Sequence, residues 1–188
     1  MLNEEVLKAY EVLKKGGVIL YPTDTIWGLG CDATDADAVN RIFAIKKRPP
    51  RKSFIILLDE AEKLPFYIEH IPEIAWDLIE NATRPTTFIY QGVQNLPSKL
   101  IAPDGTIAIR IVRNDFCKKL INLLGKPLIS TSANITGTAT PLSFKEINQE
   151  IVNKVDYVID PSTAVVEDAK PSTMIRFIDD YSFEVIRD

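Results

Sequence analysis

Apolar residues near the N-terminus recur at the spacing of an α-helix. The segment 4–13 places Val, Ala and Leu on one face and begins with two glutamates, which are favourable near the positive end of a helix. Asn3 is suited to cap this helix, and Gly16 with Gly17 would end it. The apolar run VILY, 18–21, then predicts a short buried strand.

Helical and strand-like patterns alternate along the rest of the chain. This interleaving favours an α/β or α+β fold, with helices packed on a mixed sheet. No repeat, linker or break in composition divides the sequence, so one domain over 1–188 is expected. Helices are predicted for 35–48, 71–80, 114–124 and 143–151, the last with a capping box of Ser143 and Glu146; strands are predicted for 54–58, 86–90, 106–112, 127–130, 156–160, 172–177 and 183–188.

The composition indicates a globular protein that does not cross a membrane. Of 188 residues, 46% are hydrophobic and 26% are charged, and no apolar run approaches the length of a membrane span. The acidic, amphipathic N-terminus resembles neither a signal nor a transit peptide, and two distant cysteines suit a reduced compartment, so a cytoplasmic protein is expected. The formal net charge of −4 argues against a general nucleic-acid coat but leaves room for a local basic patch.

Two polar segments follow predicted strands and are candidates for a site. YPTDTIWGLGCDAT, 21–34, has short hydroxyl and carboxylate side chains and glycines that permit close backbone approach, although the same residues are common in turns. Trp27 in this segment could stack on a base or wall a pocket. ISTSANITGTAT, 129–140, offers hydroxyls and an amide that could orient a polar ligand, or it is only a polar loop.

A basic stretch lies between these segments and has two interpretations. It is either a solvated run of charge or a binding place for phosphate, because two prolines at 49 and 50 would hold the cations in place. Arginine matches paired oxygens and lysine adds a point charge, a mixture that suits a triphosphate. Its cations are Lys46, Lys47, Arg48, Arg51 and Lys52.

Other reactive residues fit structural roles better. His70 lies in an expected surface turn without an evident partner, which argues against a Ser-His-Asp triad. Cys31 has no nearby histidine to activate it, so a structural role is favoured over a catalytic thiol. Trp76 lies on an apolar helix face and is expected in the core. Two cysteines and one histidine cannot make a zinc site unaided.

The order of short motifs resembles the YrdC/Sua5 family, which makes threonylcarbamoyl-AMP for tRNA modification. YPTDTIWGLGCDA is similar to the family's PT(D/E)T-x-YGLG segment, although Trp27 stands where tyrosine is usual. KKR at 46–48 and SAN at 132–134 resemble its K-x-R and S-x-N signature. TIAIRI, STSAN-x-x-G and PST at 171–173 follow in the expected order.

The resemblance implies a fold, a reaction and its substrates. The fold would be a twisted open mixed sheet with flanking helices and a large, concave, positively charged cavity, as in YrdC/RibB-like proteins. The enzyme would join L-threonine, bicarbonate or CO2, and ATP with its Mg²⁺, and release pyrophosphate. A separate transferase complex would then modify adenosine 37 of tRNAs that read ANN codons.

The resemblance also assigns site residues. L-Threonine would be bound by Thr25, Arg110, Ser130 and Ser172. ATP would be bound by Arg48, Lys52, Thr106, Ser132, Thr140 and Arg187. Lys46, Arg48 and Asn134 would contact phosphate or the reacting carboxylate. Arg176 stands where the family often has aspartate, and the end of the sequence at Asp188 suggests a short form without a second domain.

Two other functions remain open from the sequence. One is a carbamoyl-transfer domain of the hydrogenase-maturation type, although the cysteine clusters of such proteins are missing here. The other is an RNA-binding module that uses the basic cavity, which would bind tRNA with a steep dependence on salt and would not turn over ATP.

Overall fold

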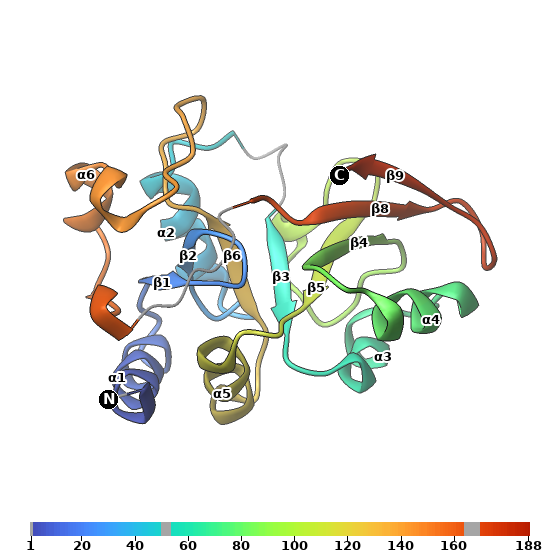
Figure 1. Cartoon of the computed structure of the whole chain (residues 1–188), viewed down its shortest axis with the longest axis horizontal. Coiled ribbons are helices and arrows are strands. Elements are labelled where there is room, and N and C mark those ends of the chain that lie inside the picture. Colours follow the sequence, from blue (N-terminus) through green and yellow to red (C-terminus); the bar gives the residue numbers. More distant parts are fainter. Residues whose placement is uncertain (1, 50–53, 164–169) are drawn as a thin grey trace.

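A computed structural model describes residues 2–49, 54–163 and 170–188 and has the mixed α/β architecture that the sequence predicts (Figure 1). Within these residues nine strands form one sheet in the order β7-β1-β2-β6-β3-β5-β4-β8-β9. The pairs β1–β7, β3–β5 and β4–β8 are parallel and the other neighbours are antiparallel. The strands are β1 (Ile19–Pro22), β2 (Trp27–Gly30), β3 (Ile55–Leu58), β4 (Thr86–Tyr90), β5 (Ile107–Ile111), β6 (Leu128–Ser132), β7 (Tyr157–Val158), β8 (Thr173–Phe177) and β9 (Phe183–Arg187).

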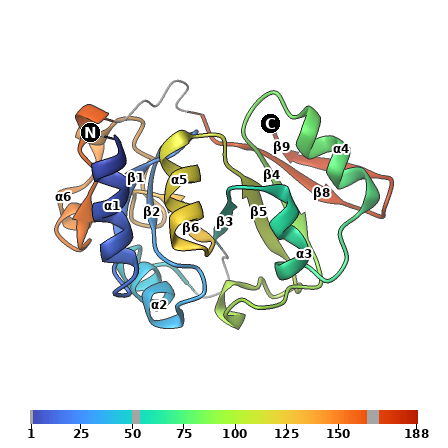
Figure 2. The same ribbon diagram turned by 90° about the horizontal axis from the view of Figure 1, so that it is seen from below.

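Helices flank the sheet, and α1 and α5 lie side by side against it (Figure 2). The helices predicted for 35–48 and 114–124 form as α2 and α5, and both are capped: Asp35 accepts hydrogen bonds from two backbone N–H groups, Asn114 accepts one, and Gly125 ends α5 in the left-handed conformation. The α-helices are α1 (Leu2–Leu13), α2 (Ala36–Ile45), α3 (Leu64–Tyr67), α4 (Glu73–Asn81), α5 (Asp115–Leu124) and α6 (Gln149–Val152); short 3-10 helices are η1 (Ala61–Lys63), η2 (Ser98–Leu100), η3 (Phe144–Glu146) and η4 (Pro161–Thr163).

The alternation of side chains in β5 separates the core from the other face of the sheet. Ile107 and Ile109 are buried in the hydrophobic core. Ala108 and Arg110 therefore point to the opposite face, because successive residues of a strand alternate. This second face carries the polar side chains described below.

Two local predictions are wrong. Helix α1 already includes Leu2, so Asn3 does not cap it and instead accepts a hydrogen bond from Lys119. The helix predicted for 143–151 breaks into η3 and α6, because Asn148 caps a new helix by accepting from Glu150 N. Ser143 and Glu146 do contact each other, at 2.9 Å.

The segment 21–34 is a hairpin rather than a long polar loop. Its second half is β2, which pairs with both β1 and β6. Gly30 is required there because a Cβ atom would lie 2.5 Å from the Tyr21 ring and 2.7 Å from the backbone oxygen of Ile129. The glycine therefore allows close packing of neighbouring strands rather than of a ligand. The turn that connects β1 and β2 spans only residues 23–26.

Both tryptophans differ from their predicted environments. Trp27 is buried against Phe144 instead of walling a pocket. Trp76 is 38% exposed, because α4 lies at the margin of the sheet beyond the main core (Figure 1). In the part of the chain that the structure describes, no helix is both long and apolar enough to cross a bilayer.

Candidate active site

A cavity of about 430 Å³ opens on the polar face of the sheet. It brings together most of the site residues predicted from the sequence, although they come from segments far apart in the chain. Nine of them line it: Thr25, Arg48, Thr106, Arg110, Ser130, Ser132, Thr140, Ser172 and Arg187. Lys46 and Asn134 lie behind its wall, and Lys52 falls outside the described residues.

The cavity is strongly basic. Arg176 joins Arg48, Arg110 and Arg187 in its lining, and Asp104 is the acidic residue among them. Burial, followed by the charge of Arg110, lowers the pKa of Arg187, and burial lowers that of Arg48. Guanidinium groups nevertheless keep their charge in proteins, so the cluster favours an anionic ligand.

The turn between β1 and β2 is organised by one hydroxyl. Thr23 Oγ1 donates to the backbone oxygen of Ile26 at 2.8 Å and accepts from the backbone N–H groups of Thr25 and Ile26. It also lies 2.9 Å from Thr25 Oγ1. These contacts hold the buried Thr25 side chain at the cavity, as expected for a threonine that builds a tight turn.

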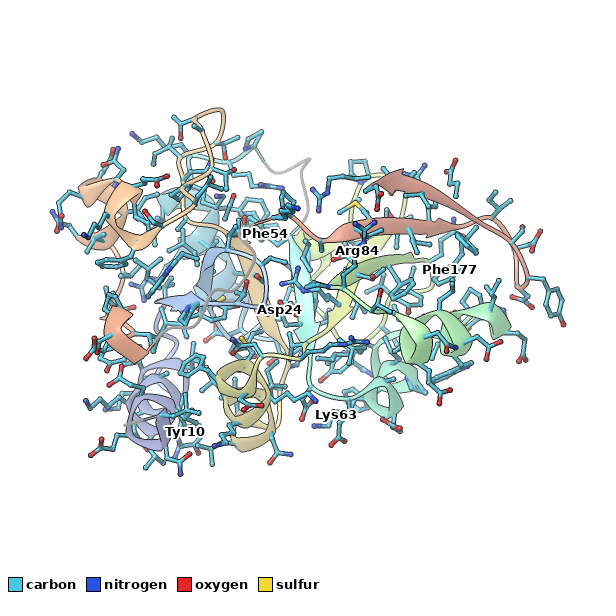
Figure 3. All side chains as sticks on the ribbon, in the orientation of Figure 1. Tyr10, Asp24, Phe54, Lys63, Arg84 and Phe177 are labelled. Carbon is cyan, nitrogen blue, oxygen red and sulfur yellow. The ribbon has the colours of Figure 1, made fainter. Side chains whose placement is uncertain are left out.

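Arg110 lies at the floor of the cavity against a buried carboxylate. Its Nη2 is 3.0 Å from Asp24 Oδ1, and the two side chains are only 3% and 9% exposed. Figure 3 places Asp24 near the middle of the molecule. Neither oxygen of Asp24, nor Nε or Nη2 of Arg110, has a hydrogen-bond partner among the described residues. The two opposite charges therefore balance each other in a buried position, and the geometry of their contact is not that of a hydrogen bond.

Asp24 is a site residue that the sequence reasoning missed. The signal was its position next to Thr25, after a buried strand. A site that binds anions is expected to contain cations rather than a carboxylate. The carboxylate of Asp24 is present because it pairs with Arg110.

Lys46 organises the segment that follows β6. Its ammonium donates to the backbone oxygens of Ser132 and Asn134, the latter at 2.7 Å, and to Asn134 Oδ1 at 3.3 Å. Ser132 Oγ donates to the same Oδ1 at 2.5 Å, and Asn134 Nδ2 donates to the backbone oxygen of Thr138. The K-x-R and S-x-N motifs thus meet in space, and Lys46 and Asn134 act on the lining through Ser132.

The three described cations of the basic stretch, Lys46, Lys47 and Arg48, point in different directions. Lys47 has a φ of 49°, a left-handed conformation that reverses the chain after α2. Lys46 consequently points inward, while Lys47 pairs with Glu150 at 3.1 Å. Arg48 lies over the Phe54 ring, 4.9 Å from its centre, and lines the cavity. Arg51 and Lys52 fall outside the described residues.

One wall of the cavity is formed by residues in or next to β8 and β9, among them Ser172, Arg176 and Arg187. Arg187 Nε and Nη2 donate to the backbone oxygen of Ser172 at 3.0 and 2.8 Å. The Ser172 hydroxyl lies 2.8 Å from that of the buried Thr87. Arg176, the unexpected charge, lines the same wall and approaches Glu184 at 3.6 Å. These contacts hold Ser172 at the lining.

The other reactive residues have structural surroundings. Cys31 is buried, and burial raises the pKa of its thiol well above the usual value, as its structural interpretation predicts. His70 is exposed, with Nε2 2.6 Å from Asp180, and is not among the lining residues.

Acidic side chains that could hold the Mg²⁺ expected from the sequence are scarce at the cavity. No group of three or more His, Cys, Asp or Glu side chains that could hold a metal ion occurs in the described ranges. Asp104 lines the cavity, and its Oδ1 already accepts from the Thr106 hydroxyl at 2.6 Å. Mg²⁺ commonly keeps several waters and binds through substrate phosphates, so a protein cage is not required.

Comparisons with known proteins agree on the family. The Sua5/YciO/YrdC family model, described as "Telomere recombination", matches residues 11–188. The chain is 35% identical over 158 residues to a threonylcarbamoyl-AMP synthase of Pseudoalteromonas translucida, which covers 82% of this chain and 84% of that relative.

Solved structures share the fold. The structure of E. coli YciO has a TM-score of 0.84 and 31% identity, and the match covers all of this chain and 90% of that one. P. abyssi Sua5 complexed with L-threonine has a TM-score of 0.88 and 28% identity over 97% of this chain; the chain spans about half, 53%, of that protein. With its described elements, cavity and ordered motifs, this chain belongs to the Sua5/YciO/YrdC family.

Proposed function

We propose that this protein is a threonylcarbamoyl-AMP synthase, which converts L-threonine, bicarbonate or CO2, and ATP to threonylcarbamoyl-AMP and pyrophosphate. The observation that carries the proposal is one basic cavity lined by Arg48, Arg110 and Arg187 together with hydroxyl side chains. Relatives that match most of the chain bear the name of this activity.

The chemistry joins two anions. The threonine amine forms an N–C bond with CO2 and loses a proton, which leaves a carbamate. A carbamate oxygen then attacks the α-phosphorus of ATP as the bond to the β-phosphate breaks, and pyrophosphate leaves. Mg²⁺ bound to ATP would neutralise phosphate charge. The barrier is mainly charge repulsion, so positioned cations can supply catalysis without a protein acid or base.

The cavity residues take roles that follow their chemistry. Arg110 suits the threonine carboxylate, because a guanidinium can bind both oxygens of a carboxylate. Thr25, Ser130 and Ser172 would complete the L-threonine subsite.

The other arginines of the cavity suit the phosphates of ATP. Arg48 and Arg187 would bind phosphates, with Thr106, Ser132 and Thr140 as hydroxyl ligands. Lys52 stays a predicted phosphate ligand. Lys46 and Asn134 would contribute by holding Ser132 at the lining.

We expect the product to pass to a separate transferase complex that modifies tRNA in the cytoplasm. Threonylcarbamoyl-AMP is a mixed anhydride and hence reactive, so an acceptor enzyme must consume it before water does. The basic cavity could also contact RNA. That contact would weaken steeply as salt is raised, because bound cations are released from the phosphate backbone.

Measurement of pyrophosphate release tests the proposed reaction. Release should require L-threonine, bicarbonate, ATP and Mg²⁺ together, and mass spectrometry should detect threonylcarbamoyl-AMP. Arg48→Ala should weaken ATP binding, while Arg113→Ala is the matched control, because Arg113 binds the backbone oxygen of Ala82 away from the lining. Salt-sensitive tRNA binding without turnover would instead favour the RNA-binding module.

A further inference from the structure

A surface groove lies between helix α4 and the turn that joins β8 to β9, outside the basic cavity. The two elements lie side by side at one end of the molecule (Figure 1, Figure 2), and Ile74 N donates to the backbone oxygen of Asp180 at 2.9 Å. The groove has a volume of about 410 Å³. Its lining residues, none of which lines the basic cavity, are Glu73, Ile74, Trp76, Asp77 and Tyr181.

Local hydrogen bonds hold the turn in place beside the helix. Asp179 Oδ1 accepts from the backbone N–H of Tyr181 at 2.8 Å, and Ile178 N donates to the backbone oxygen of Ser182 at 3.0 Å. His70, just before α4, has Nε2 at 2.6 Å from a side-chain oxygen of Asp180 in the turn. The groove is therefore already formed in the free protein, which lowers the cost of ordering it when a ligand binds.

Two aromatic side chains of the groove are exposed to solvent. Trp76 is 38% exposed and Tyr181 is 77% exposed, and Ile178 in the same turn is also exposed. Tryptophan and tyrosine bury a large area and keep a polar group for hydrogen bonding when another protein covers them, so they are enriched at protein interfaces. Their position on one surface therefore indicates a docking surface.

The same surface carries negative charge that α4 does not balance. Apart from His70, every charged side chain in the segments 66–81 and 177–184 is a carboxylate. Glu73, Asp77 and Glu80 recur at the spacing of one helix face, where like charges repel. Glu80 also lies in the last turn, near the negative end of the helix dipole. The remaining carboxylates of the two segments are Glu69, Asp179, Asp180 and Glu184.

The chemistry of the groove selects a cationic protein segment. Its carboxylates repel nucleic acid and anionic lipid surfaces, which are themselves negatively charged. A guanidinium, by contrast, pairs with carboxylates and stacks on aromatic rings. The acidic face runs along a helix of nine residues, about 13 Å, which is farther than one small cation reaches.

We propose that the groove between α4 and the β8–β9 turn binds an arginine-bearing basic segment of a partner protein. One guanidinium would lie against the rings of Trp76 and Tyr181 and beside the carboxylates of Glu73 and Asp77. Flanking cations of the segment would pair with the rest of the acidic face. The groove shares no lining residue with the basic cavity, so this inference does not depend on the proposed function.

Peptide titration followed by NMR tests the docking surface. The probes are capped hexapeptides in which glycine alternates with arginine or with lysine, added to the isotope-labelled full chain. Trp27 is buried and Trp76 lines the groove, so their two indole N–H signals report on different places. The arginine peptide should shift the Trp76 signal and not that of Trp27. It should bind about threefold or more tightly than the lysine peptide, because guanidinium stacks on aromatic rings and pairs with both oxygens of a carboxylate.

Substitution of the two rings tests the stacking contact. Trp76→Ala should weaken binding of the arginine peptide about fivefold, as measured from the backbone amide signals of α4. Tyr181→Ala should also weaken it, and the Tyr181 side chain is so exposed that this variant serves if Trp76→Ala does not fold. Thermal denaturation shows whether each variant is folded. Unchanged affinity in both folded variants would overturn the proposal.

Paired charge variants separate the groove from the net charge of the protein. Glu73→Gln combined with Asp77→Asn should weaken the arginine peptide about tenfold. The control is Glu11→Gln combined with Asp37→Asn, which removes the same charge from exposed positions on α1 and α2 and should change little. Equal weakening by both pairs would show that the peptide follows net charge alone and would contradict a docking groove.

Two further outcomes would also overturn the proposal. One is an unchanged Trp76 signal in the unmodified protein at millimolar arginine peptide. The other is binding of free L-argininamide as tightly as the peptide, because a small cation would then account for the groove without a partner segment.

Discussion

The Lys46 ammonium and Asn134 meet behind the cavity wall, where Lys46 donates to both the backbone oxygen and the side-chain oxygen of Asn134. A lysine at the end of α2 therefore fixes a loop 88 positions further along the chain. Lys46 and Asn134 thus hold Ser132 from behind, whereas the half-buried Arg48 lines the cavity itself.

Replacing Lys46 by methionine should disturb the position of Ser132 in the cavity lining, although Lys46 itself does not line the cavity. Lys46→Met leaves three oxygens of the 132–134 segment without this donor. An acceptor that loses its partner costs up to about 1–3 kcal/mol when buried, and these are partly buried, so the free energy of unfolding should fall and the KM for ATP should rise. Chemical denaturation and pyrophosphate kinetics measure these effects. The control is Lys47→Met, which removes only an exposed pair with Glu150.

The pH dependence of stability should carry the signature of the buried Lys46. Burial, and then the charge of Arg48, lower its pKa from 10.5 to about 7. Between these values the unfolded chain holds a proton that the folded chain has lost, so the free energy of unfolding should rise with pH through this window. The cost of burying the charged form is fully present below pH 7.

Denaturation from pH 6.5 to 8.5 checks this dependence, because the buried cysteines Cys31 and Cys117 oppose it only nearer pH 9. The difference in stability between the unmodified protein and Lys46→Met should grow as pH rises. A difference independent of pH would mean that Lys46 stays protonated in the folded state.

Even the conservative substitution of Arg187 by lysine should impair the enzyme. Its Nε and Nη2 both grip the backbone oxygen of Ser172, which a single ammonium cannot reproduce. Arg187→Lys should raise the KM for ATP about tenfold, since one charge-assisted bond contributes about 1.5–3 kcal/mol. Steady-state kinetics measure it. Arg41→Lys is a matched control, because Arg41 grips Gly16 and Asp156 away from the cavity lining; equal effects in both variants would contradict a role at the site.

Much of the architecture was predictable because local signals agreed with the fold. Strand β5 and helices α2 and α5 form within the ranges predicted for them. The helix predicted for 143–151 is broken because Asn148 caps a new helix. In the segment 21–34, the close approach at Gly30 is to the neighbouring strands, which only the tertiary structure reveals.

The site was predictable as a set of residues but not as a geometry. The resemblance selected the lining residues, whereas nothing local indicates that Lys46 turns inward and Lys47 outward. That separation depends on the left-handed backbone of Lys47 and on partners more than eighty residues away. Asp24 was missed because its role depends entirely on Arg110.

Glu5 should matter for stability without contacting the cavity. This buried carboxylate accepts from the Tyr157 hydroxyl and Asp160 N, both at 2.9 Å, and from Lys8 at 3.1 Å. Burial raises its pKa, but the hydrogen bonds from Asp160, Lys8 and Tyr157 outweigh burial and lower it overall. The stability contributed by the carboxylate is therefore present at neutral pH and lost as pH falls through the lowered pKa.

Glu5→Gln should reduce the free energy of unfolding by about 1–3 kcal/mol at pH 7, because the glutamine amide has one accepting oxygen where the carboxylate has two. The deficit should shrink near pH 4, below the ordinary carboxyl pKa of 4.5, because the unfolded chain there takes up a proton that the folded chain does not yet hold. Urea denaturation at both pH values, with the exposed Glu11→Gln as control, measures it. A double-mutant cycle with Tyr157→Phe should give a coupling energy above about 0.5 kcal/mol. Additive effects would show that the hydroxyl contact contributes nothing, and the tie between α1 and the 157–160 segment would then rest on Asp160 N.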